Sequence, residues 1–519
     1  MRNAIQIAER ARQRSCAAAC GCALFLAACI AGCGGGAAPP GNPPAIPPPS
    51  EITAAEAQAI TEAAAQSVDV PLVVAVTNRT GVILAVFRKP GAPLTATGNF
   101  GAAVDANELA VALARTAAFF SNDQAPLSSR TVRFISGIHF PPGVSSTPNA
   151  ALYGIENTNR GCSLDVTFAA GKAVAPAGLI SGASPGLGVI TGKVDLMDSD
   201  AGAVHPGGVP LFKQGRLVGG VGVVAAANDV AEFAAFTAAF TAGFGVSPAP
   251  PRVVVIDGIA LPFVQQTTRP AGVGPGAPGG AYVVGPVASP GPVPDGDLVT
   301  PVAGGSGGLS AAEVRTVVDA AVAVADQTRA VIRLPSGSRA RMVIAVSDLD
   351  GTILGLHRMP DATVFSIDVA VAKARNLVYL SGAAANPSDL PGVPVGTAVT
   401  NRTISFGAQP LYPPGIDGTT PGPFFNLYVQ DTANPCTNGS QTPGPRQNGI
   451  VFFPGSVPLY RNGVLVGALG ISGDGVEQDD FVADGGSAGF SAPSGIRADQ
   501  LILNGARLPY LKFPRNPTD

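Results

Sequence analysis

Histidines come first, because imidazole is the side chain that most often binds metals and moves protons near neutral pH. The chain has three: His139, His205 and His357. No two have the spacing of a metal pair on one helix face or one strand, so each is a lone ligand or a surface histidine. His357 is the best ligand candidate, since it precedes Arg358, whose planar guanidinium could pair a carboxylate. The alternative for Arg358 is an ion pair with Asp361 or Asp368.

Two aspartates, Asp348 and Asp350, follow an apolar run and resemble the nucleophile motif of haloacid dehalogenase-type phosphatases. There the first Asp is the nucleophile and the second is a general acid beside magnesium. Asp350-Gly351 between two apolar runs is also a strong hairpin signal, and Thr80-Gly81 stands at the matching place of an earlier, similar segment. A hydrolase of this type is therefore the third alternative. No Ser lies in a Gly-x-Ser-x-Gly turn, so a serine nucleophile is not indicated.

The elements that must position these residues occur twice. Residues 207–222 and 455–470 each read as a strand, a Gln-Gly or Asn-Gly turn and a second strand, which predicts a β-hairpin. The other paired features are capping boxes at 53–56 and 310–313, buried strands at 72–76 and 342–346, helices at 107–120 and 366–380, and closing segments at 256–263 and 503–510. Features repeated in the same order indicate a tandem duplication.

Each copy is expected to be an α+β domain with helices packed on an antiparallel sheet. The first domain spans 51–269 and the second 309–519, and long Pro/Gly insertions at 171–206 and 410–454 precede the terminal hairpins. The Pro/Gly-rich linker at 270–308 has no hydrophobic period, so we expect it to be mobile.

The N-terminus is expected to be a targeting segment. Residues 1–33 carry a basic start and a short apolar run, and Ile30-Ala-Gly-Cys33 resembles a bacterial lipobox with Cys33 as the lipidated residue. Gly34 after Cys33 favours the outer membrane by the same resemblance, and residues 34–50 would be the flexible tether. Cys29 is an alternative lipidation site, and an ordinary secretory signal is the alternative interpretation. The expected location is the cell envelope, on the periplasmic or surface face.

Two cysteines, Cys162 and Cys436, remain beyond that segment and occupy matching places in the two copies. In an oxidising compartment this indicates a disulfide between the copies. Two free thiols or a thiolate metal ligand remain open, because sequence does not show how close the Cα atoms lie.

Charge is sparse and nearly balanced, with Lys+Arg 32 against Asp+Glu 35. This is not the footprint of a nucleic-acid-binding protein, so we expect no nucleic-acid partner. Beyond the targeting segment no apolar run is long enough to cross a bilayer, so the expected membrane contact is the lipid anchor alone.

The second copy carries a series of landmarks in the same order as a known family. They are Val343–Gly351, Arg358–Ala362, Ser366–Ala374, Pro458–Gly463 and Gly470–Asp479, while the first copy retains Leu152–Ile155 and Asn159–Gly161. Together these segments resemble the haem-binding or haem-degrading GlcG–HbpS-like family, which also forms the C-terminal domain of some corrinoid adenosyltransferases. The family assembles into oligomers, so the resemblance implies that the two fused copies pack as a pseudo-twofold pair, with higher oligomers left open.

The resemblance also implies a ligand site in the second copy. The candidate ligand-binding residues are His357, Arg358, Asp368, Glu477 and Asp479, with the metal unknown. For Glu477, Asp479 and the neighbouring Asp480, the alternative is that acids at a helix start complement the helix dipole. Lys373 is expected to be a solvated charge.

The first copy departs from the family, since 223–232 lacks the Val-Glu-Gln-Asp acids and 104–108 lacks Ser-Ile-Asp. Some relatives coordinate haem through histidines on the opening helix, and neither 56–67 nor 313–325 contains one. The leading hypothesis is a lipid-anchored envelope protein that binds a small ligand, haem or a related tetrapyrrole, without turnover. The alternative is a structural or interaction lipoprotein with a degenerate site.

Overall fold

The computed structural model describes residues 51–139, 150–174, 178, 180, 188–189, 191–198, 205–247, 253–256 and 258–519. Pro49–Asp519 forms one compact unit. The expected signal peptide, Cys33 and the tether at 34–50 lie outside the described residues.

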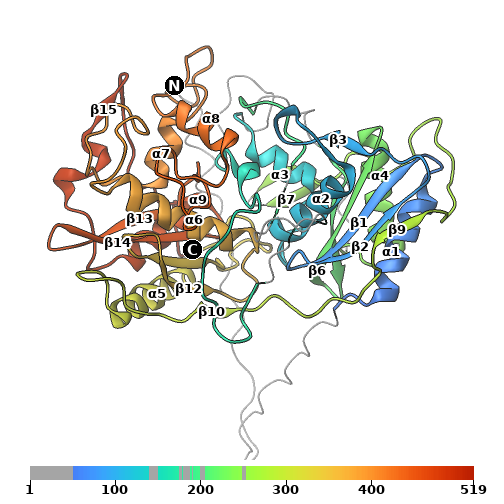
Figure 1. The fold of residues 1–519 in the computed structure, drawn as a ribbon, viewed down its shortest axis with the longest axis horizontal. Helices are drawn as coiled ribbons and strands as arrows, with labels where there is room; N and C mark the ends of the chain where they lie inside the picture. The colour runs from blue at the N-terminus through green and yellow to red at the C-terminus, as the bar shows by residue number, and fades with distance from the viewer. Residues whose placement is uncertain are drawn as a thin grey trace, which may run out of the picture. The chain divides into compact units, whose positions relative to one another are not determined.

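The first copy is built on a five-stranded antiparallel sheet (Figure 1). Its strand order is β5 (Gly208–Lys213), β6 (Arg216–Ala225), β1 (Leu72–Asn78), β2 (Ile83–Arg88) and β9 (Ala281–Val284). Helices α1 (Ala54–Ser67) and α4 (Asn228–Thr241) pack together against the sheet, and α2 (Ala106–Phe120) packs on β6 and β1.

The second copy repeats this arrangement. Its strand order is β10 (Gly296–Val299), β12 (Ile353–Arg358), β11 (Val343–Ser347), β14 (Val464–Ser472) and β13 (Ser456–Arg461). Helices α5 (Ala311–Ala325) and α9 (Val476–Gly486) pack together, and α6 (Phe365–Leu380) packs on β14 and β11. The α+β class expected from the sequence is confirmed in both copies.

The local signals that predicted these elements are present as side-chain contacts. The Thr53 and Ser310 side chains each accept a hydrogen bond from the amide three residues on, and the Glu carboxylate at that position accepts one from the Thr53 or Ser310 amide, so both capping boxes form. The hairpin turns place Gln214 and Asn462 at φ 54° and 53°, each followed by a glycine with positive φ, as two-residue hairpins require.

Glycines in the terminal hairpins let the middle helices approach the sheets closely. A Cβ at Gly222 would collide with the Ala110 carbonyl oxygen of α2, and one at Gly470 would collide with the Ala370 carbonyl oxygen of α6. The repeated glycines therefore set the distance between helix and sheet in both copies.

The linker differs from its expectation, because it is part of both sheets. Its residues 281–284 form β9, which pairs with β2, and its residues 296–299 form β10, which pairs with β12. Each four-residue strand covers the edge of a sheet, and this pairing fixes a segment whose proline and glycine content predicted mobility.

Smaller elements occupy the remaining segments. They are β3 (Thr95–Thr97), β4 (Ala103–Asp105), α3 (Ser129–Ser136), β7 (Val253–Ile256), β8 (Ile259–Pro262), α7 (Asn401–Gly407), α8 (Phe425–Ala433), β15 (Ile502–Leu503), β16 (Ala506–Arg507) and the 3-10 turns Asn99–Gly101, Ile155–Asn157, Ser494–Ile496 and Ala498–Gln500. The hairpins β7–β8 and β15–β16 close the two copies alike, as the sequence predicted.

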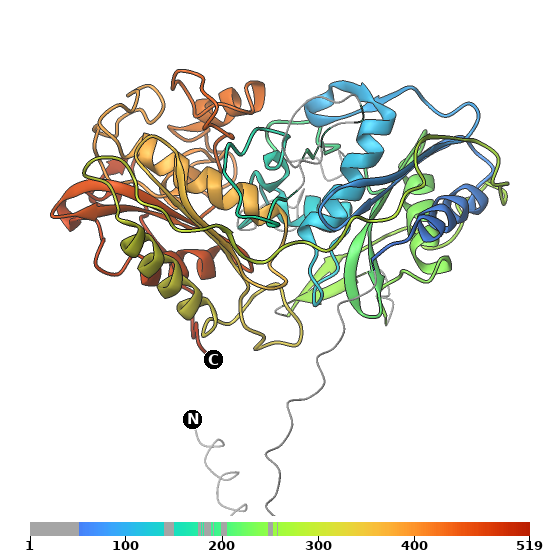
Figure 2. The same cartoon turned by 60° about the horizontal axis from the view of Figure 1, so that its bottom comes forward.

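The end of α2 meets the start of α6 where the two copies pack together, near the middle of the unit in Figure 2. Phe120 stacks on Phe365 with ring centroids 4.4 Å apart. Asp361 accepts hydrogen bonds from Arg79 of the other copy at 2.7 Å and from Arg333 at 2.6 Å. Pairing of the fused copies within one chain is therefore observed.

Cys162 and Cys436 are joined by a disulfide, with Cα atoms 5.3 Å apart. Of the alternatives left open by the sequence, the structure contains the covalent link between the copies. It joins the Asn159–Cys162 region of the first copy to the end of α8 in the second.

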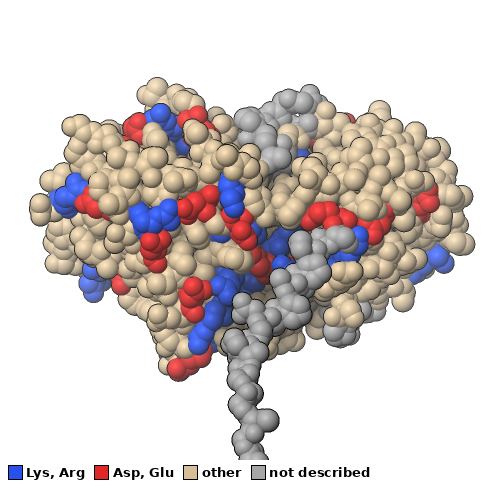
Figure 3. Space-filling view, turned by 90° about the horizontal axis from the view of Figure 1, so that it is seen from below, with Lys and Arg blue, Asp and Glu red and all other residues tan. Residues whose placement is uncertain are grey.

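Acidic and basic side chains are interleaved over the face drawn in Figure 3, and large areas carry neither. Several of the described charges are partners in ion pairs, such as Arg315–Asp297 at 2.5 Å and Arg341–Asp326 at 2.7 Å. None of the described helices has the length and apolar character needed to cross a bilayer.

Candidate functional site

His357 lies on β12, where its Nδ1 is 2.8 Å from Asp297 Oδ1 of the neighbouring strand β10. The same carboxylate is 2.5 Å from Arg315 of α5, so His357 belongs to a small ion cluster on the α5 side of the sheet. Burial raises the pKa of Asp297, but its contacts with Arg315 and His357 outweigh burial and leave that pKa below its ordinary value.

Arg358 is 2% exposed, and its guanidinium donates to backbone carbonyls instead of facing solvent, where it could bind an anion. Its Nε donates to the Ala362 carbonyl at 3.0 Å and its Nη1 to the Pro294 carbonyl at 3.2 Å. Burial lowers the pKa of Arg358 to about 9. The ion pair that the sequence offered as an alternative does not form, because Asp361 is bound by Arg79 and Arg333.

Asp368, in the first turn of α6, is buried at the contact between the copies. Its carboxylate accepts from Asn448 Nδ2 at 2.6 Å and from the Asn159 amide of the first copy at 2.9 Å. Burial raises its pKa despite these bonds. A cavity of about 10 Å³ lies beside it, a volume near the lower limit for a single water.

The two remaining candidates, at the start of α9, face different surroundings. Glu477 pairs with Lys512 near the surface. Asp479 is buried and lies 3.1 Å from Lys373 Nζ, and burial raises the pKa of Asp479 to about 7. The expectation that Lys373 is solvated is wrong, because every residue of α6 is buried.

These five side chains therefore lie in separate surroundings: the α5 face, the linker contact, the contact between the copies, the surface and the core behind β14. The structure does not bring them to one shared cavity among the residues it describes. Each already has a partner within the chain.

Asp348 and Asp350 occupy the turn between the antiparallel strands β11 and β12. Asp348 Oδ2 accepts from the Gly305 amide at 2.6 Å, and Asp350 Oδ1 caps the Thr352 amide at 2.9 Å. A phosphatase of the haloacid dehalogenase type needs a strand that leads to a helix in a parallel sheet. The hydrolase alternative is therefore wrong, since a hairpin forms there instead.

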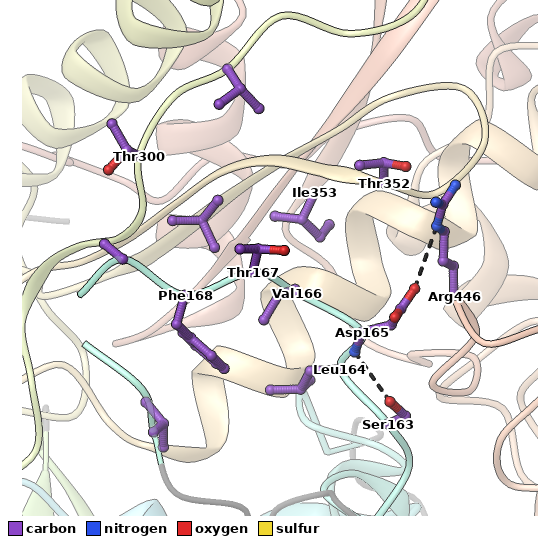
Figure 4. Close-up of a pocket in the computed structure, with 14 residues that line it drawn as sticks. Ser163, Leu164, Asp165, Val166, Thr167, Phe168, Thr300, Thr352, Ile353 and Arg446 are labelled. Atoms are coloured by element: carbon purple, nitrogen blue, oxygen red, sulfur yellow. Dashed lines mark hydrogen bonds and ion pairs between the residues drawn. The ribbon is translucent and has the colours of Figure 1, made fainter. Parts of the chain in front are cut away.

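A groove of about 770 Å³ opens beside this turn (Figure 4). Its walls come from a first-copy segment (163–174), the linker (299–302), the start of β12 and the second-copy insertion. The lining residues are Ser163, Leu164, Asp165, Val166, Thr167, Phe168, Ala169, Val174, Val299, Thr300, Val302, Thr352, Ile353 and Arg446.

Backbone contacts hold the first-copy wall in place. The Ala169 amide donates to the Leu298 carbonyl of β10 at 2.8 Å, and the disulfide at Cys162 anchors the other end. Buried Arg375 of α6 donates to the Leu164 carbonyl at 2.7 Å and to the Gly351 carbonyl at 2.9 Å. This one side chain joins the wall to the hairpin turn.

The groove is lined by apolar side chains and threonines, and its charged side chains lie at one end. Figure 4 shows Arg446, Asp165 and Ser163 together at that end, with Phe168 and Thr300 farther along. Arg446 Nε lies 3.4 Å from Asp165 Oδ2, and its Nη1 pairs with Asp350. The Arg446 side chain is 41% exposed, so it can reach a ligand at the rim.

Sequence reasoning did not find this groove, because its walls come from segments far apart in the chain. The one local signal is the alternation Leu164-Asp-Val166-Thr-Phe168, which is typical of a half-buried extended segment. Within the described residues, no group of three or more His, Cys, Asp or Glu side chains has the geometry of a metal site.

Comparison of the copies shows which acids at this helix start are shared. Glu232 of α4 accepts from Arg130, and Asp480 of α9 accepts from Arg402, in matching positions. The acid that follows the Val-Glu-Gln-Asp motif is therefore present in both copies. Asp479, the last residue of the motif, is matched by Ala231 in the first copy.

Comparison with known proteins finds a family match in the second copy. The family described as "Haem degrading protein HbpS-like" matches residues 309–488, which are most of the second copy. The first copy shares its sheet order and helix arrangement.

Two curated proteins are similar over part of the chain. Corrinoid adenosyltransferase PduO of Salmonella typhimurium is 28% identical over 156 residues, which are 30% of this chain. The uncharacterized 15.0 kDa protein of the dhaT–dhaS intergenic region of Citrobacter freundii is 28% identical over 143 residues, 28% of this chain and 71% of that protein. The match to the adenosyltransferase spans only 34% of its length.

Two solved structures are also similar. The Klebsiella pneumoniae protein ORFY is 22% identical with a TM-score of 0.24, over 36% of this chain and 92% of that chain. The PduOC:Heme complex is 26% identical with a TM-score of 0.24, over 36% of this chain and 98% of that chain.

Proposed function

We propose that this chain binds a tetrapyrrole, haem or a related macrocycle, in the groove and releases it unchanged. The observation that carries the proposal is the groove itself, which combines several apolar side chains with an arginine at one end. Its volume of about 770 Å³ lies within the roughly 300–1,000 Å³ of small-molecule pockets.

The comparisons support the ligand class. The matched family is described as haem degrading, one similar structure is a heme complex, and the adenosyltransferase relatives are named for corrinoids, which are related macrocycles. A flat apolar ring with acidic side groups would place its ring against Val166, Phe168 and Ile353 and an acid against Arg446.

Binding without conversion is favoured by the chemistry of the lining. The carboxylate in it, Asp165, is paired with Arg446, and the other polar side chains are hydroxyls of Ser and Thr. Such a set supplies contacts and one anion partner, whereas general acid–base catalysis needs a group with a suitable pKa held at the reacting atom.

Attachment to the cell envelope through Cys33 is part of the same proposal. It is supported by the lipobox-like Ile30-Ala-Gly-Cys33 and by the Gly/Pro-rich residues 34–50 that follow. We expect labelled palmitate to be incorporated into the expressed chain and to be lost in Cys33→Ala but kept in Cys29→Ala. Incorporation that is lost only in Cys29→Ala would move the anchor to that residue.

The binding test is a haemin titration of residues 34–519, followed by absorbance. We expect saturable binding that Val166→Glu weakens at least about tenfold, because a buried charge in the apolar wall must be desolvated. Val464→Glu, the same change at a residue that is 64% exposed on the β13–β14 turn, is the matched control and should bind like wild type.

A second candidate is a structural or interaction lipoprotein. The observation that favours it is that the side chains expected to bind the ligand are engaged within the chain, as in His357–Asp297 and Lys373–Asp479. Absence of saturable binding by any tetrapyrrole would favour this structural or interaction function over ligand binding.

A further inference from the structure

We infer that the groove recognises the macrocycle and its carboxylate, and that no side chain of the protein ligates the central metal. The ligand class is then tetrapyrroles in general, metal-free ones included. This inference rests on the proposed function and specifies which parts of the ligand the protein recognises.

The lining of the groove lacks the usual axial donors. Its fourteen described residues include no His, Met, Cys or Tyr, and the nearest ionisable groups are Asp165 and Arg446, which pair with each other. Haem iron in proteins is commonly held by His, Met, Cys or Tyr. The residues present therefore fit the ring and its acid, and they do not fit axial ligation.

The His, Cys, Met and Tyr side chains of the described chain lie outside this lining. His357 Nδ1 is bound to Asp297 on the α5 side, His205 Nε2 lies 2.8 Å from the Thr97 carbonyl, and His139 lies 3.3 Å from Asp417. Met342 and Met359 are buried against each other. Cys162 and Cys436 are in the disulfide.

Arg446 is the residue that can recognise an acid on the ligand. Of its two partners, Asp350 is 60% exposed on a hairpin turn, so breaking its ion pair with Arg446 costs little free energy. A ligand carboxylate could replace Asp350 and bind Nη1 and Nη2 of Arg446 in the bidentate geometry that arginine favours. Asp165 would keep the guanidinium at the rim.

These contacts do not depend on the metal. Burial of a ring face on apolar side chains and pairing of a carboxylate with arginine are the same for haemin, zinc protoporphyrin and protoporphyrin IX. An axial ligand would instead favour the iron form strongly.

The experiment titrates residues 34–519 with these three porphyrins, by absorbance and fluorescence. We expect dissociation constants within about threefold of one another, which is less than about 1 kcal/mol. Electron paramagnetic resonance of the haemin complex should lack a low-spin signal from a protein nitrogen or sulfur ligand, and His357→Ala should change neither affinity nor spectrum.

Arg446→Ala should weaken all three porphyrins about equally and leave the affinity for the dimethyl ester of protoporphyrin IX unchanged. Arg461→Ala is the control, since Arg461 has a similar exposure of 34% and also pairs with an acid, Glu313. Haemin binding at least about tenfold tighter than protoporphyrin IX, with a low-spin signal lost in His357→Ala, would overturn the inference while the proposed function stood. Failure of all three porphyrins to bind would overturn the proposed function itself.

Discussion

At the scale of single residues, the Lys373–Asp479 pair is the clearest difference between the two copies. Both side chains are at most 4% exposed, and Lys373 Nζ also donates to the Ile471 carbonyl at 2.7 Å. In the first copy the matching residues are Leu113 and Ala231, so the same place in the fold also accepts an apolar pair. The ion pair is therefore a property of the second copy and is not required by the fold.

Replacing one partner should be costly, because it leaves a buried charge without compensation, at about 3–5 kcal/mol. We expect Lys373→Leu to lower the free energy of unfolding by about that amount in a denaturant titration at a pH above 7, where Asp479 is ionised in wild type. Lys373→Leu with Asp479→Ala rebuilds the pair of the first copy and should recover most of the loss. A double variant as unstable as the single one would contradict this account.

The pH dependence of stability follows from the same carboxyl. Burial raises the pKa of Asp479 to about 7 from its ordinary 3.8, so the folded chain keeps a proton that the unfolded chain releases. The stabilisation from this group is complete below about pH 4 and is lost as pH rises through about 7. We expect the stability of wild type relative to Asp479→Asn to fall over that window. Asp319→Asn, the same change at an exposed residue, is the control.

At the scale of elements, the local patterns predicted what local forces decide. The capping boxes at Thr53 and Ser310 and the Gln-Gly and Asn-Gly turns form as expected, because each depends on residues a few positions apart. The groove and the strands β9 and β10 were missed, since a four-residue strand between prolines and glycines is held only by a distant partner. The site residues were placed on the right elements, yet their partners come from other segments.

Hydrogen exchange in the linker tests whether strand pairing orders β9 and β10. Amides of 281–284 and 296–299 should exchange slowly with deuterium, because strand pairing with β2 and β12 protects them. Residues 277–280, which are exposed in the same linker, should exchange quickly and provide the internal comparison. Fast exchange throughout 270–308 would restore the expectation of a mobile tether.

At the scale of the whole molecule, side chains of the insertions form bonds between the two copies. Lys193 of the first copy donates to the Tyr428 hydroxyl of α8 at 2.8 Å, and Asn157 donates to the same hydroxyl at 2.9 Å. Burial lowers the pKa of Lys193 to about 7. Arg160 adds an ion pair with Asp431 at 2.8 Å beside the disulfide. The long insertions thus build the contact between the copies, and one of them also supplies a groove wall.

The disulfide should therefore support both stability and binding. It closes a sequence separation of 274 residues, and loop entropy predicts a stabilisation of about 2–5 kcal/mol. Cys162→Ser with Cys436→Ser should lower the melting temperature and also weaken porphyrin binding, because Cys162 anchors the start of the wall at 163–174. Dithiothreitol should reproduce both effects in wild type and change neither in the double variant. A double variant with lower stability but unchanged affinity would mean that β10 and Arg375 hold the groove wall without the covalent link.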